Sequence, residues 1–250
     1  MTNVRSITVL SLVLLNAFTA LAAEKDAAAA GGSVDAVLEK YVKAVGGKEA
    51  LSKVESRSIK ADLVLAGSTS DWTLIAKAPN KRFSHVDVPD IGVFEEGCDG
   101  DTSWTKTQGG IQTRQGDELA HAKAEADFRR ELRMKELYPG LEAKGTERFN
   151  GEEVQVLEAK PSATSKERFS FSTKTGLLVR QQSDFVNNDG TPVTVEAEFS
   201  DHRDVDGIKY AHTQKIAILA NGQPLLDFTL KVKEIKHNEK VDDVKFKKPT

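Results

Sequence analysis

The feature that most limits the fold of this chain is a long succession of segments in which every second residue is apolar. Residues 59–65 read IKADLVL, and residues 193–199 read VTVEAEF. The same pattern recurs in segments 72–78, 154–156, 169–171, 208–218 and 226–232. Such alternation is typical of antiparallel strands with one buried face and one solvated face. About eleven strands are expected, without the regular exchange of strands and helices that a parallel α/β fold requires.

Dipeptides that favour tight turns separate these segments. They are Asp99-Gly100, Asn150-Gly151, Asp189-Gly190, Asp206-Gly207 and Asn221-Gly222. Asn-Gly and Asp-Gly between alternating segments are typical of two-residue hairpins, because both residues tolerate the positive φ of a type I′ turn. We therefore expect most strands to pair with their neighbours in the sequence.

Two segments have the periodicity of helices instead. Between Ser33, a residue type that caps helices, and Gly46-Gly47, apolar residues recur on one face of an amphipathic helix. These are Val34, Val37, Leu38, Tyr41, Val42 and Val45. A second helical segment runs from about residue 117 to Pro139-Gly140, and its irregular apolar pattern indicates a break between Lys123 and Arg130.

The first residues have the pattern of a signal peptide rather than of a folded domain. Arg5 precedes an apolar run from Ile7 to Leu15, and small residues follow up to Ala23. This layout predicts a signal peptide over residues 1–23, cleaved near Ala22 or Ala23, and a periplasmic or secreted soluble product. The alternative is a membrane anchor, which ordinarily needs a longer apolar run. A linker at 24–32 and a single domain at 33–250 would follow.

Composition excludes several classes of function. The chain has 35 Lys and Arg against 38 Asp and Glu, a net charge of −3, so no basic field favours nucleic acid. Its one cysteine, Cys98, excludes an internal disulfide framework and a cysteine-clustered zinc site. The Asp99 and Asn187 loops lack the residue order of a hand-type calcium site. We expect no metal and no cofactor.

About eleven strands curled around one apolar face enclose more space than their own side chains fill. The expected fold is therefore α+β: a half-closed antiparallel barrel with helices over its concave face, lined either by an apolar cavity or by a solid core. The candidate ligand-binding residues are the large apolar members of the strands and two covering residues of the second helical segment. They are Leu63, Trp72, Leu74, Phe128, Leu132, Phe169, Phe171, Tyr210, Ile216 and Phe228.

Three segments resemble the periplasmic lipoprotein-carrier (LolA-like) superfamily. The segment 77–83 (KAPNKRF) leads into a strand, 99–104 (DGDTSW) is an Asp-Gly hairpin ending in tryptophan, and 243–249 (DVKFKKP) is similar to the family's closing F-x-x-P. The segment 41–51 resembles a less characterised envelope branch of the superfamily. This resemblance implies an open barrel with a helical lid that shelters acyl chains in transit. One departure is Ala78, where the carrier has a basic residue that tethers the lid.

Catalytic motifs are sparse. Glycine-flanked serine, His-Glu-x-x-His and P-loop patterns do not occur in the sequence. The densest titratable cluster is Asp201-His202-Arg203-Asp204, which could serve a hydrolase but lies where a charged hairpin end is expected. We therefore expect a non-catalytic monomer that binds or shuttles a lipid or acylated molecule, with an envelope lipoprotein or a membrane-embedded donor or acceptor as partner. An interaction module with a solid core is the alternative, and the hydrolase is the third.

Overall fold

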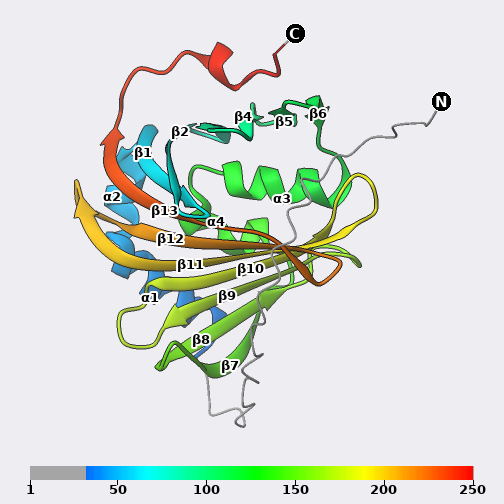
Figure 1. Cartoon of the computed structure of the whole chain (residues 1–250). Coiled ribbons are helices and arrows are strands. Elements are labelled where there is room, and N and C mark those ends of the chain that lie inside the picture. The colour runs from blue at the N-terminus through cyan, green and yellow to red at the C-terminus, as the bar shows by residue number, and fades with distance from the viewer. Residues whose placement is uncertain (1–31, 250) are drawn as a thin grey trace, which may run out of the picture.

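The computed structural model describes residues 32–249, in which four α-helices accompany thirteen β-strands (Figure 1). The predicted leader at 1–23 and all of the predicted linker except Gly32 lie outside the described residues. The elements are α1 Val34–Val45, α2 Gly47–Lys53, β1 Ser56–Leu65, β2 Ser68–Lys77, β3 Lys81–Val88, β4 Gly92–Cys98, β5 Ser103–Thr107, β6 Gly110–Thr113, α3 Gly116–Ala126, α4 Arg130–Leu137, β7 Glu142–Phe149, β8 Glu152–Ala159, β9 Lys166–Ser172, β10 Leu178–Val186, β11 Pro192–Val205, β12 Ile208–Ala220, β13 Gln223–His237 and a 3-10 turn Asp243–Phe246.

All thirteen strands form one sheet in the order β6-β5-β4-β3-β2-β1-β13-β12-β11-β10-β9-β8-β7. Neighbours in the sequence pair antiparallel, and β1 pairs antiparallel with β13. β6 and β7 are the free edges of the sheet, so the barrel stays open. The predicted α+β open antiparallel barrel is confirmed.

The structure has two strands more than the alternation predicted. Both edge strands lack the signal that the alternation provides. β6 has four residues, and most residues of β7 are exposed. Short or polar edge strands protect a sheet from pairing with other chains, and for the same reason they carry no apolar alternation.

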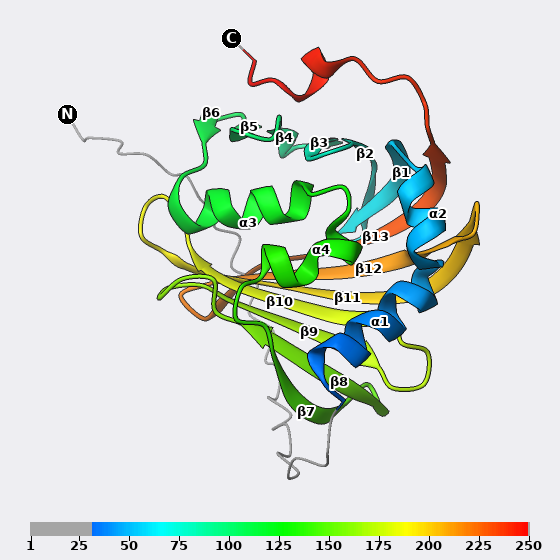
Figure 2. The ribbon, with the colours of Figure 1, turned by 180° about the vertical axis from the view of Figure 1, so that it is seen from behind.

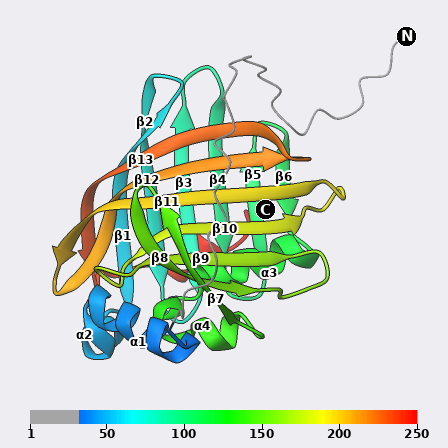
Figure 3. The ribbon, with the colours of Figure 1, turned by 90° about the horizontal axis from the view of Figure 1, so that it is seen from below.

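The α3–α4 segment connects the two free edges of the sheet, and it does so across the concave side. Figures 1 and 2 show α3 between the layer of β2–β6 and the layer of β8–β12. Figure 3 shows the strands of these two layers crossing one another, with α1, α2 and α4 at one end. The predicted break is confirmed, because α3 ends at Ala126 and α4 begins at Arg130.

The first helix follows its sequence pattern. The Ser33 hydroxyl accepts a hydrogen bond from the Ala36 amide at 3.3 Å, and Val37, Tyr41 and Val45 are buried. The helix ends at Gly46, whose φ of +134° is unfavourable for other residues. A Cβ atom on Gly46 would lie 2.3 Å from the Gly207 carbonyl oxygen, so glycine allows the α1–α2 junction to touch the β11–β12 turn.

Three of the five predicted hairpin turns have the expected geometry. In the two-residue loops 150–151, 206–207 and 221–222, both residues have positive φ, as a type I′ turn requires. The prediction is wrong for Asp99-Gly100 and Asp189-Gly190, where only the glycine has positive φ and the loops span 99–102 and 187–191. The carboxylate of Asp99 accepts amide hydrogen bonds from Asp101 and Thr102, which favours the longer loop.

A fourth type I′ turn was not predicted from the sequence, because its first residue is alanine. Ala66 has φ of +48° between β1 and β2. Alanine is strained there, whereas asparagine tolerates this region. Ala66→Asn is expected to stabilise the protein by about 0.5–1 kcal/mol in urea unfolding. The reciprocal control, Asn150→Ala in another type I′ turn, should destabilise by a similar amount. Equal stability of Ala66→Asn and the parent protein would contradict the assigned strain.

The C-terminal segment, residues 238–249, covers the outer side of β2–β5 (Figure 1). Phe246 is fully buried against Phe83 and Trp104, and the indole nitrogen of Trp104 donates to the Phe246 carbonyl oxygen at 3.1 Å. Asp243 lies 2.7 Å from Lys77 and 2.5 Å from Lys81. The segment that resembles the family's closing motif is therefore an integral part of the fold.

Candidate functional site

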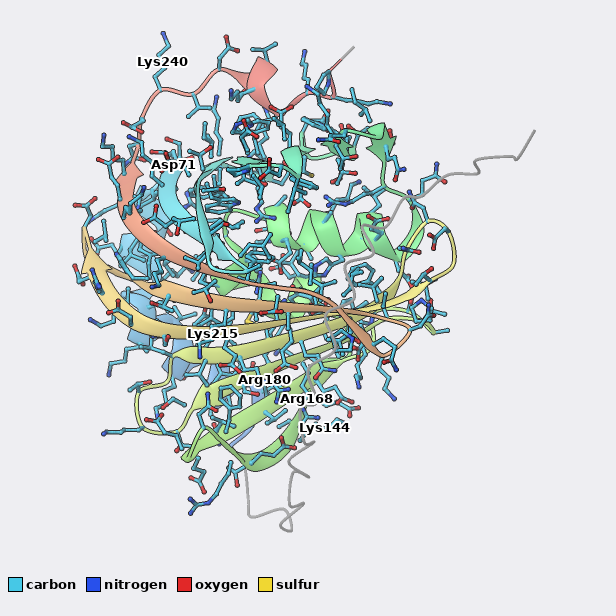
Figure 4. The ribbon with its side chains drawn as sticks, viewed as in Figure 1. Asp71, Lys144, Arg168, Arg180, Lys215 and Lys240 are labelled. Atoms are coloured by element: carbon cyan, nitrogen blue, oxygen red, sulfur yellow. The ribbon has the colours of Figure 1, made fainter. Side chains whose placement is uncertain are left out.

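The two faces of the sheet differ in chemistry. The outer face of the long strands carries charged side chains, among them the labelled Lys144, Arg168, Arg180 and Lys215 (Figure 4). Several are paired across strands, as Arg180 is with Glu196 at 2.8 Å. The inner face carries the alternating apolar residues and faces the helices. Any apolar ligand site is therefore expected on the inner face, where two clusters of apolar side chains lie.

One cluster is filled by the helices, and we call it the filled cluster. At its centre Phe169 and Phe171 are 0% and 2% exposed. The ring of Tyr41 from α1 lies 5.0 Å from Phe171, and that of Tyr138, directly after α4, lies 4.8 Å from Phe169. Five candidate ligand-binding residues lie in this cluster: Phe128, Leu132, Phe169, Phe171 and Tyr210. The helices cover the strand residues of this cluster, and eleven hydrophobic residues around it, among them Phe128, Leu132 and Tyr210, are partly buried.

The second cluster is only partly covered, and we call it the open cluster. It joins β1–β4 to β12 and β13, with six buried residues and eight that are only partly buried. Four candidate ligand-binding residues lie in it: Leu63, Trp72, Ile216 and Phe228. The tenth candidate, Leu74, is buried on β2 and pairs in register with Ile59 of the open cluster. Leu226, two residues before Phe228 in β13, is 37% exposed.

Two hollows are found among the described residues. One of about 380 Å³ lies beneath the C-terminal segment, where Ile75, Phe83 and Lys245 line it, and Ile59 and Leu74 also contribute to its lining. The other, of about 400 Å³, is lined by Lys77, Asn238 and residues beside them. Both are rimmed by charged side chains. The concave face therefore offers a partly exposed apolar surface, and the described hollows belong to the C-terminal segment.

Polar contacts hold α3 against the sheet, which the sequence analysis did not predict. Glu125 lies 2.5 Å from Arg130 and accepts a hydrogen bond from Gln181 of β10 at 3.1 Å. His121 lies 3.1 Å from Glu167 of β9. The spacing of His121 and Glu125 places both on one face of α3, and this face is turned inward. The polar stripe of α3, formed by His121 and Glu125, was the sequence signal from which these contacts could have been predicted.

The Glu125–Arg130 pair has an electrostatic consequence. Burial alone would raise the pKa of Glu125, but the Arg130 guanidinium, together with His121, Arg82 and the hydrogen bond from Gln181, outweighs burial and lowers this pKa from 4.5 to about 2. A carboxylate whose pKa is lower in the folded state stabilises the fold above its unfolded pKa. That stabilisation is lost as the pH falls from 4.5 towards 2, and it amounts to about 3 kcal/mol.

Glu125→Gln is therefore expected to lower the free energy of unfolding at pH 7 by about 3 kcal/mol, because it leaves the partly buried Arg130 without its carboxylate partner. The difference from the parent protein should shrink as the pH falls through this window, measured by urea unfolding at several pH values. Glu49→Gln removes an exposed pair with Lys53 and should leave the stability close to that of the parent protein. A pH-independent difference for Glu125→Gln would contradict the assignment.

The α3–α4 junction carries its own tether. Arg129 donates to the carbonyl oxygens of Leu51, Ser52 and Val54 at the end of α2, at 2.6, 3.0 and 2.5 Å. The Phe128 amide donates to the Pro79 carbonyl oxygen at 2.9 Å. The α3–α4 junction is thus held both at the end of α2 and at the residue that follows Ala78.

The Asp201–Asp204 cluster has a local structural role. Asp201 has φ of +53° and, like His212 opposite it, forms no bridge in the otherwise continuous β11–β12 register. It pairs with Arg203 at 2.6 Å on the surface, and Asp204 accepts a hydrogen bond from the Gly207 amide in the next turn. Within residues 32–249, no group of three His, Cys, Asp or Glu residues could hold a metal ion. Burial raises the pKa of the Cys98 thiol, which makes a thiolate less accessible.

Comparisons with known proteins bear on the fold. No family model matches the sequence, and no curated protein matches it. A DUF1329 family protein from Desulfovibrio piger is similar in structure, with a TM-score of 0.54 and 13% identity over 86% of this chain and 97% of that one. The LolA superfamily protein NE2245 from Nitrosomonas europaea has a TM-score of 0.51 and 13% identity over 87% and 98% of the two chains.

At this level of identity the likeness concerns the fold. The chain has a LolA-like fold, as the resemblance seen in its sequence implies. None of the helices in the described range is both long and apolar enough to cross a membrane.

Proposed function

We propose that this protein binds the acyl chain of an envelope lipid or acylated molecule on its open cluster and shuttles it without catalysis. One observation carries the proposal: the inner face of a LolA-like barrel keeps large apolar side chains, including Trp72 and Phe228, only partly covered. Contiguous apolar surface of this kind usually marks a binding site. The similar solved structures share the LolA-like fold, and this analogy of fold adds support only as such.

The proposal divides the ten candidate residues by role. Leu63, Trp72, Ile216 and Phe228 contact the acyl chain, with Leu74 beneath them. The other five belong to the filled cluster, which fixes the helices beside the open cluster. A fully buried chain of about fifteen methylenes gains on the order of 12 kcal/mol, at about 0.8 kcal/mol each. A partly open surface gains less, so we expect dissociation constants on the order of micromolar.

The cellular setting follows from the sequence pattern at residues 1–23. Export with cleavage near Ala22 or Ala23 would release a monomer into the periplasm or the medium. Its partners would be an envelope lipoprotein or a membrane-embedded donor and acceptor. No cofactor is required, because transfer of an acyl chain from water into an apolar site is favourable by itself.

The filled cluster favours a second candidate function, an interaction module that binds another protein on its surface. Titration of delipidated protein with cis-parinarate, a fluorescent fatty acid, and with its methyl ester separates the two. Saturable binding of either probe supports acyl binding. Absence of saturable binding of both probes would overturn it and leave the interaction module as the better account.

A further inference from the structure

The inner face of the sheet changes from polar to apolar along β1 and its neighbours. One row of residues in register across β13, β1, β2, β3 and β4 is polar or small: His237, Arg57, Ala76, Arg82 and Cys98. Four residues along β1, a second row on the same face is wholly apolar: Val232, Ala61, Trp72, Val86 and Phe94. At about 3.3 Å per residue, the two rows lie about 13 Å apart.

Arg57 is the most unusual residue of the polar row. Its guanidinium carbon lies 5.1 Å from the ring centroid of Tyr210 and 5.6 Å from that of Phe128. Its Nε atom is buried and has no hydrogen-bond partner among the described residues. No described carboxylate lies within 4.0 Å of the guanidinium nitrogens. Arg57 as a whole is partly buried. Partial burial of a cation without a paired anion is unfavourable, and a ligand that supplies the anion would offset that cost.

Arg82 lies two strands away in the same row. The intervening residue is Ala76, a small side chain, and two strand spacings amount to about 10 Å, which two arginine side chains can bridge to one group. Arg82 faces inward, because its charge helps to lower the pKa of Glu96 and of Glu125. Both carboxylates already have closer arginine partners, Arg114 at 2.8 Å and Arg130 at 2.5 Å.

The remaining neighbours of Arg57 supply acceptor atoms and one further charge. Tyr210 shares a hydrogen bond of 3.0 Å with Nε2 of His237, and Nδ1 of His237 lies 2.9 Å from Asp206. The Asp206 carboxylate therefore contacts the ring nitrogen of His237 that Tyr210 does not. Glu131 on α4 also interacts with Arg57 through its charge, but at a distance beyond an ion pair.

We propose that Arg57 and Arg82 form a subsite for the anionic head group, a carboxylate or a phosphate, of a single-chain amphiphile whose tail lies on the open cluster. The juxtaposition of a partly buried guanidinium that has no carboxylate partner with an apolar surface on the same strands matches the two ends of such a molecule. Guanidinium groups favour carboxylate and phosphate oxygens because their donors are planar and fixed. This inference rests on the proposed function and adds the class of ligand to it.

The test compares cis-parinarate, which has a free carboxylate, with its uncharged methyl ester. The delipidated parent protein is expected to bind the acid at least about tenfold more tightly than the ester, as one charge-assisted contact allows. Arg57→Met, which keeps an unbranched side chain but removes the guanidinium, should bring the ratio close to one while ester binding persists. Arg57→Lys keeps the charge and should restore part of the preference. Lys60→Met, on the solvent side of the same strand, is the control and should keep the full ratio.

Each outcome separates this inference from the proposed function. Equal binding of acid and ester by the parent protein would overturn the head-group subsite and leave acyl binding intact. An unchanged ratio in both Arg57→Met and Arg82→Met would also overturn it, and Arg82→Met serves as the test if Arg57→Met does not fold. Displacement of the acid by inorganic phosphate at constant ionic strength, with the ester unaffected, would show a site for free anions and overturn the assignment to an amphiphile. The absence of such displacement is the expected result.

Discussion

Phe171→Asp is expected to abolish the folded state. Phe171 is 2% exposed in the filled cluster, and the ring of Tyr41 lies 5.0 Å away. The substitution removes the packing of a buried phenylalanine, which costs about 3–5 kcal/mol, and adds a carboxylate without a partner. Together these costs approach the total stability of an ordinary domain. Circular dichroism should show no cooperative thermal transition.

The control for this prediction is Phe171→Leu, which keeps an apolar side chain and should cost only about 1–2 kcal/mol. A Phe171→Asp variant that melts cooperatively near the temperature of the parent protein would show that water reaches this cluster. The filled cluster would then be a cavity after all.

Phe228→Asp is expected to weaken ligand binding while the protein stays folded, in contrast to Phe171→Asp. Phe228 is only partly buried in the open cluster, so a carboxylate there keeps contact with water and the fold should survive. An acyl chain on the open cluster would have to desolvate this charge. Binding of methyl cis-parinarate, which has no charge of its own, should therefore weaken at least tenfold, or about 1.4 kcal/mol.

A matched control lies next to this position. Thr229 is the following residue of β13 and lies on the opposite face, where it pairs in register with Lys215. Thr229→Asp adds the same charge to the outer face and should leave both the melting temperature and ester binding close to their parent values. Equal losses of binding in Phe228→Asp and Thr229→Asp would indicate a general effect of charge and would contradict a site on the inner face.

The sequence predicted those parts of the fold in which local pattern and tertiary packing agree. The apolar stripe of α1, with Val37, Tyr41 and Val45, is buried as its spacing indicates. The Asn-Gly turns at 150 and 221 have the conformation that their residues favour. Where both levels point to the same structure, pattern analysis is sufficient.

The remaining parts depend on partners that are distant in the sequence. His121 and Glu125 occur on α3 as an ordinary polar stripe, and only the crossing of the concave face turns this stripe towards Glu167 and Gln181. Alternation places Phe171 and Phe228 on strand faces, yet it cannot show which of them a helix covers. That difference arises from the path of α1 and α4 over one half of the sheet.

The most direct test of acyl binding on the open cluster uses the two tryptophans of the chain. Trp72 lies in the open cluster, whereas Trp104 is 1% exposed beneath the C-terminal segment. In a Trp104→Phe variant, a bromine-labelled fatty acid should quench the fluorescence of Trp72 saturably, because bromine quenches at contact. In a Trp72→Phe variant, the fluorescence of Trp104 should stay unchanged over the same titration. Absence of saturable quenching of Trp72, or equal quenching of Trp104, would contradict an acyl chain on the open cluster.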